Sequence, residues 1–158
     1  MLFRSALVRT LKGVVVFLAV LAAIFYGFVF PQLIRDMGAV DFSWLVTPAI
    51  VAVSISALPI VVALVLFWGI CTDIGRDNSF CRRNAQRLSG IGFCAMADTA
   101  YCVVGTVTIF AITGGHPGVL LVATAAILVG LAIALAAFLL SHLVLKAAEL
   151  KDENDLTI

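Results

Sequence analysis

Residues 117–145 read PGVLLVATAAILVGLAIALAAFLLSHLVL and contain no Asp, Glu, Lys or Arg. A helix of this length extends about 43 Å at 1.5 Å per residue, whereas the hydrocarbon core of a bilayer is about 30 Å thick. Lipid offers the backbone no hydrogen-bond partner, so only a helix satisfies such a segment internally. The stretch therefore predicts a membrane-spanning helix. Its excess length predicts tilt or protrusion, and protrusion is favoured because Lys146, Glu149 and Lys151 follow without a helix breaker.

Three further stretches are long and apolar enough to span a bilayer, at 13–30 (closed by Pro31), 45–70 and 91–113. Each approaches or exceeds the about 20 apolar residues that a crossing needs, and none alternates as a barrel strand does. Basic residues before the first stretch resemble a signal peptide, but the length of the apolar run favours a retained helix. We therefore expect one all-α membrane domain over residues 1–158, folded as a four-helix transmembrane bundle.

The composition excludes several classes of protein. Hydrophobic residues make up 63% of the chain and charged residues 12%, against roughly 45–50% and 25% in ordinary soluble domains. A soluble domain of 158 residues could not bury that much apolar surface. A water-soluble enzyme, a nucleic-acid-binding domain and a disordered tail are therefore excluded. The net charge of +1 provides no overall field to steer a charged partner.

The placement of basic residues predicts the orientation. With the N-terminus in the cytoplasm, the outer segments contain only Arg35 of the 10 Lys and Arg residues. Cytoplasmic loops carry the excess of Lys and Arg in membrane proteins. We therefore expect both termini, a loop at 71–90 and a tail at 146–158 to be cytoplasmic, in a bacterial cytoplasmic membrane.

Polar side chains share one face of the third predicted span. Cys94, Asp98 and Cys102 recur every four residues, with Tyr101 beside them. A carboxylate inside a span is costly and suggests a functional role by default. Asp98 is either a structural acid that hydrogen-bonds Tyr101, Thr99 or a neighbouring helix, a coupling acid that binds a proton or cation, or part of a ligand or metal site.

The sequence gives no support for an enzyme or a cofactor, because no nucleophile and base occur in a recognisable constellation. The four cysteines, at 71, 81, 94 and 102, lack the spacing diagnostic of zinc. We expect reduced thiols near the cytoplasmic side and no bound metal. Small residues at 126, 130 and 134 of the fourth span pack either inside the bundle or against a second copy of the chain.

The loop at 71–90 carries the densest charge of the chain. We expect a turn near residues 77–79, anchored by Phe80, and then a short amphipathic helix from about Arg82. Arg82, Arg83 and Arg87 would face anionic lipid, at about 1 kcal/mol per cation, or a soluble partner. They could also pair with the acidic tail residues Glu149, Asp152, Glu153 and Asp155.

The loop Ser79-Phe-Cys-Arg-Arg-Asn-Ala-Gln-Arg-Leu-Ser-Gly-Ile-Gly92 resembles one bacterial family of four-helix membrane proteins, domain of unknown function 2975. That family's loop has the form Gly-x-Pro-Phe-Ser-x-Glu-Asn-x-x-Arg-Leu-x-x-Ile-Gly, and its tail is acidic and closes with Leu-Thr-Ile, as here. The matching positions are Phe80, Asn84, Arg87, Leu88, Ile91 and Gly92. Cys81 and Arg83 depart from the family's Ser and Glu, which weakens the Ser-capped helix start.

The resemblance implies a partner. Members of this family often resemble binding partners of a small helix-turn-helix transcription regulator that is encoded beside them. The chain would sequester that regulator or relay a membrane signal to it, without touching nucleic acid itself. The residues expected to bind the partner are Phe80, Arg82, Arg83, Asn84, Arg87, Glu149, Glu153 and Leu156. The alternative is a small transporter or channel, in one or two copies, that uses Asp98.

Overall fold

The computed structural model describes residues 2–38, 43–75, 80–114 and 117–155. Within these ranges the chain is entirely helical outside its connections. The elements in order are α1 (Leu2–Ile24), the π-helical turn η1 (Phe25–Val29), α2 (Phe30–Gly38), α3 (Ser43–Gly75), α4 (Arg82–Thr113) and α5 (Pro117–Asp155).

Four helical segments in the described part of the chain are long and apolar enough to cross a membrane. They are Val8–Gln32, Trp44–Gly75, Arg82–Ile112 and Pro117–Asn154. Three of them contain a span that the sequence predicts, and Arg82–Ile112 covers all but the last residue of the predicted span at 91–113. This agreement supports a multi-pass membrane protein and confirms the all-helical class.

The first predicted span does not end at Pro31. The chain passes from α1 through η1 into α2, where Pro31 is the second residue, and the Phe30 N–H bonds the Phe25 carbonyl five residues back. Proline lacks an N–H, and its ring clashes with the carbonyl four residues earlier, which here belongs to Gly27. Gly27 lies in the π-helical turn η1, whose hydrogen bonds span five residues instead of four. The chain therefore continues as a helix past the proline.

The amphipathic helix expected from Arg82 is not a separate element. It forms the first turns of α4, which continues without interruption to Thr113. Gly90 and Gly92 lie inside this helix, where a Cβ would approach Leu66 Cδ1 and Phe138 Cε1 to 2.9 Å in each case. These glycines therefore admit side chains of α3 and α5 rather than breaking the helix.

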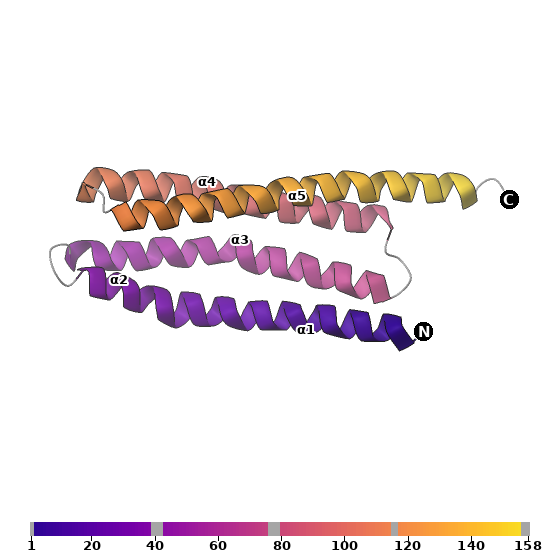
Figure 1. Cartoon of the computed structure of the whole chain (residues 1–158), viewed down its shortest axis with the longest axis horizontal. Helices are drawn as coiled ribbons and strands as arrows, with labels where there is room; N and C mark the ends of the chain where they lie inside the picture. Colours follow the sequence, from indigo (N-terminus) through magenta and orange to yellow (C-terminus); the bar gives the residue numbers. More distant parts are fainter. Residues whose placement is uncertain (1, 39–42, 76–79, 115–116, 156–158) are drawn as a thin grey trace.

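The helices pack in the order α1, α3, α4, α5. In the described residues α1 packs on α3, α3 on α4 and α4 on α5, whereas the backbone of α1 approaches neither α4 nor α5. Figure 1 shows the start of α1, the end of α3, the start of α4 and the C-terminal end of α5 at the same end of the molecule, with α5 projecting beyond its neighbours.

The α4–α5 interface depends on small residues. A Cβ on Gly130 would collide with the Thr99 side chain of α4, and Ala134 is fully buried. The Ser141 hydroxyl donates to the Ala85 carbonyl at 2.7 Å. Gly130 and Ala134 thus pack against α4 inside the molecule, which is one of the two predicted alternatives, the other being packing against a second copy. Ala126, the third small residue, is exposed.

Candidate functional site

The start of α4 is joined to the end of α3 by an ion pair. Arg87 Nη1 donates to Asp73 Oδ2 at 2.6 Å and to Asn84 Oδ1 at 3.4 Å. The side chains of Arg87 and Asp73 are only 25% and 12% exposed. A Cβ on Gly69 would lie 2.7 Å from Arg87 Cζ, so the guanidinium rests against the backbone of α3. Arg87 therefore points into the α3–α4 pair. The sequence had suggested instead that it faces headgroups, a partner or the acidic tail.

Two fully buried side chains, Asn84 and Cys71, lie at the same end of the α3–α4 pair. Asn84 is in the first turn of α4, where its N–H bonds the Cys81 carbonyl at 3.0 Å. Cys81 is the N-cap, and its side chain makes no capping hydrogen bond. The backbone and the buried network fix the start of α4, in place of the serine cap that the family pattern would supply.

Six of the exposed residues at this end form what we call the corner surface: Phe80, Arg82, Arg83, Glu149, Asp152 and Glu153. It joins the start of α4 to the end of α5. Arg82 Nε lies 3.9 Å from Asp152 Oδ2, with both side chains more than 60% exposed. One of the expected contacts between the loop and the tail is therefore present. Arg76 and Leu156 lie outside the described residues, as does the side chain of Asp155.

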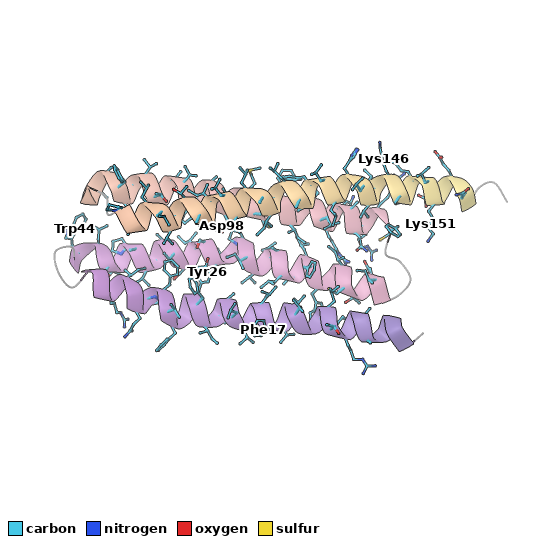
Figure 2. All side chains as sticks on the ribbon, in the orientation of Figure 1. Phe17, Tyr26, Trp44, Asp98, Lys146 and Lys151 are labelled. Atoms are coloured by element: carbon cyan, nitrogen blue, oxygen red, sulfur yellow. The ribbon has the colours of Figure 1, made fainter. Side chains whose placement is uncertain are left out.

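A second polar cluster lies inside the helices. Tyr26 of η1 and Ser56 of α3 are hydrogen-bonded through their hydroxyls at 3.3 Å. Asp98 and Cys102 of α4 are close enough to interact electrostatically with the Tyr26 hydroxyl. Figure 2 shows Asp98 and Tyr26 at the same level along the molecule. Three elements thus bring polar groups to one place within the apolar spans.

Within this cluster, Asp98 Oδ1 is shielded from solvent and has no hydrogen-bond partner among the described residues. The partners expected on its own helix are engaged elsewhere. The Tyr101 hydroxyl donates to the Ala52 carbonyl at 2.8 Å, and the Thr99 hydroxyl donates to the Ala95 carbonyl at 2.7 Å. The prediction that Asp98 is held by Tyr101 or Thr99 is therefore wrong.

Sequence reasoning found Asp98, Cys94 and Cys102 but missed Tyr26 and Ser56. These two are polar side chains in otherwise apolar segments, and that was the available signal. Cys94 is half-buried and lies one turn before Asp98. Over the described residues, no three His, Cys, Asp or Glu side chains are arranged to hold a metal ion.

Comparison with known proteins gives one match. The model of a family described as a protein of unknown function (DUF2975) matches residues 32–158, from α2 through α5. No curated protein and no solved structure matches the chain.

Proposed function

This chain belongs to the DUF2975 family of proteins of unknown function, and from that starting point we propose that it is a non-enzymatic membrane protein whose corner surface binds a cytoplasmic helix-turn-helix regulator. Binding would hold the regulator at the membrane or relay a membrane signal to it. The observation that carries this proposal is the gathering of exposed charges of both signs, from α4 and α5, at one end of the molecule.

The cytoplasmic placement of this end rests on the charge distribution. The start of α1, the facing ends of α3 and α4 and the end of α5 lie together, so this arrangement would give one side of the membrane nearly all of the Lys and Arg residues. The positive-inside rule assigns that side to the cytoplasm. A soluble regulator could then reach the corner surface directly.

The contacts divide the basic residues of this end into two roles. Arg82 and Arg83 are exposed and could contact a partner. Arg87 is paired with Asp73 and holds the start of α4 against the end of α3. The Arg82–Asp152 pair is exposed, and such pairs contribute only about 0–1 kcal/mol. An acidic segment of a regulator could therefore take the place of Asp152 at little cost. A basic segment could bind the end of α5 instead.

Pull-down from membranes tests this proposal. The tagged protein is extracted from its native host in mild detergent, and co-purifying proteins are identified by mass spectrometry. We expect a helix-turn-helix regulator with the unaltered chain and its loss with the double variant Arg82→Ala/Arg83→Ala. The matched control is Arg35→Ala/Lys146→Ala, which removes two exposed cations from α2 and α5. A regulator lost equally from both variants, or found with neither protein, contradicts the proposal.

A transporter or channel is the second candidate, favoured by Asp98. Its Oδ1 is shielded and has no hydrogen-bond partner among the described residues, and the carboxyl group is close enough to the Tyr26 hydroxyl to interact electrostatically. A carboxyl group in this setting could accept a proton or bind a cation. Proton or cation flux into liposomes that contain the protein, abolished by Asp98→Asn but not by Thr108→Val on an exposed part of α4, would support this function. Flux that survives Asp98→Asn removes Asp98 from the mechanism.

A further inference from the structure

An open apolar groove of about 360 Å³ runs between α1 and α3. One wall consists of Val15, Val16, Ala19, Ala22 and Ala23 of α1 with Tyr26 of η1, and the α3 wall begins at Ala57 and ends at Trp68. The volume lies within the about 300–1,000 Å³ typical of ligand pockets. Alanines line much of the α1 wall, so the hollow exists because short side chains face one another there.

The groove has the length of one leaflet. Eleven residues separate Val15 from Tyr26 and Ala57 from Trp68, which corresponds to about 16 Å along each helix. Half of the about 30 Å hydrocarbon core is about 15 Å. A lipid acyl chain from the leaflet at the N-terminal end therefore fits the groove along its whole length. A helix of a second copy would run on through both leaflets, past Tyr26, where the groove ends.

The end of the groove nearest the N-terminus is positively charged. Lys12 lies on the same face of α1 as Val15 and Val16, and its Nζ sits 5.1 Å from the centre of the Trp68 ring. Arg9 is exposed one turn earlier. Among the described residues, neither cation forms an ion pair with a carboxylate. These two charges are therefore available to a phosphate at the level where the lipid headgroup would lie.

From these three features we infer that the α1–α3 groove binds one phospholipid with an anionic headgroup, its acyl chain between Ala19 and Ala57 and its phosphate at Lys12 and Arg9. This inference is independent of the corner surface, which lies on α4 and α5. Because Trp68 lines the groove and its ring lies under the Lys12 ammonium, lipid binding would also restrain how α1 sits against α3.

Native mass spectrometry of the full chain in detergent, titrated with phosphatidylglycerol or phosphatidylcholine, tests the site. We expect one tightly retained phosphatidylglycerol. Lys12→Gln should weaken phosphatidylglycerol binding about fivefold, the effect of one cation at the membrane surface, with little change for phosphatidylcholine. Lys12→Arg should restore it. Ala57→Leu, which fills the groove, should weaken the binding of both lipids.

Two matched controls separate this site from the general lipid coat. Lys146→Gln removes an exposed cation from α5, and Ala136→Leu enlarges an exposed alanine of the same helix. Both should bind phosphatidylglycerol as the unaltered chain does. Equal binding of the two lipids, equal loss in Lys146→Gln and Lys12→Gln, or a groove closed by a second copy in a dimer would each overturn the inference. Circular dichroism and gel filtration establish that every variant is folded.

Discussion

Arg87 Nη1 and Asp73 Oδ2 lie 2.6 Å apart and link α4 to α3 on either side of their connection. The guanidinium also contacts Asn84 and covers Gly69. The corner surface therefore stands on a partly buried ion pair whose arginine the sequence had suggested to be exposed.

Arg87→Ala should lower stability, because it leaves Asp73 largely buried without its partner. Hydrogen bonds to charged groups contribute about 1.5–3 kcal/mol, so we expect a loss of that size in thermal or denaturant unfolding in detergent. Arg83→Ala, at an exposed site, should change stability by less than about 0.5 kcal/mol. Equal effects of the two variants would contradict the pairing with Asp73.

The Arg82–Asp152 pair should contribute almost nothing to stability. Both side chains are exposed and the atoms are 3.9 Å apart, so a double-mutant cycle with Arg82→Ala and Asp152→Ala should give a coupling below about 1 kcal/mol. Raising the salt concentration should reduce it further. A larger, salt-resistant coupling would show that the tail is fixed to the corner surface.

Gly130→Ala should destabilise the α4–α5 interface, because its Cβ would collide with Thr99. Overpacking of this kind costs about 1–3 kcal/mol. Gly105→Ala is the control, since a Cβ there meets nothing within 4 Å and alanine favours a helix over glycine by about 1 kcal/mol. Unfolding in detergent should therefore show a lower stability for Gly130→Ala and an unchanged or higher stability for Gly105→Ala.

Asp98→Leu should leave stability unchanged or raise it. The Oδ1 atom is buried without a partner among the described residues, and an apolar group of similar size avoids the desolvation cost of such an atom. Thermal unfolding of Asp98→Leu against the unaltered chain measures the effect. A loss of more than about 1 kcal/mol would mean that the carboxyl group has a structural partner.

Thiol labelling can test the orientation. Cys71 is fully buried, whereas Cys81 is half-exposed at the start of α4. In right-side-out vesicles, an impermeant maleimide should label Cys81 only after the membrane is opened. Cys71 should react only on unfolding, and mass spectrometry of peptides distinguishes the two. Labelling of Cys81 in sealed vesicles would reverse the proposed topology.

The sequence was sufficient for the fold class, because runs of apolar residues longer than about 20 leave few alternatives to helices in lipid. It also singled out Asp98, since one carboxylate among apolar residues is conspicuous. It placed Arg87 wrongly because the direction of that side chain depends on how α4 is rotated against α3. It missed Tyr26, although that residue lies inside the predicted span at 13–30, because its hydrogen bond to Ser56 and its approach to Asp98 depend on how the helices pack against one another.

The length of α5 has a mechanical consequence. Its 39 residues form one uninterrupted rod about 58 Å long, nearly twice the thickness of the hydrocarbon core. In a chain that spans a bilayer as proposed, a change in the tilt of this rod would move the turns of α5 that project beyond its neighbours. A tilt of about 10° about its midpoint would swing the last turn by about 5 Å, given a half-length of about 29 Å. Changes in membrane thickness or tension would thereby become displacements on the aqueous side.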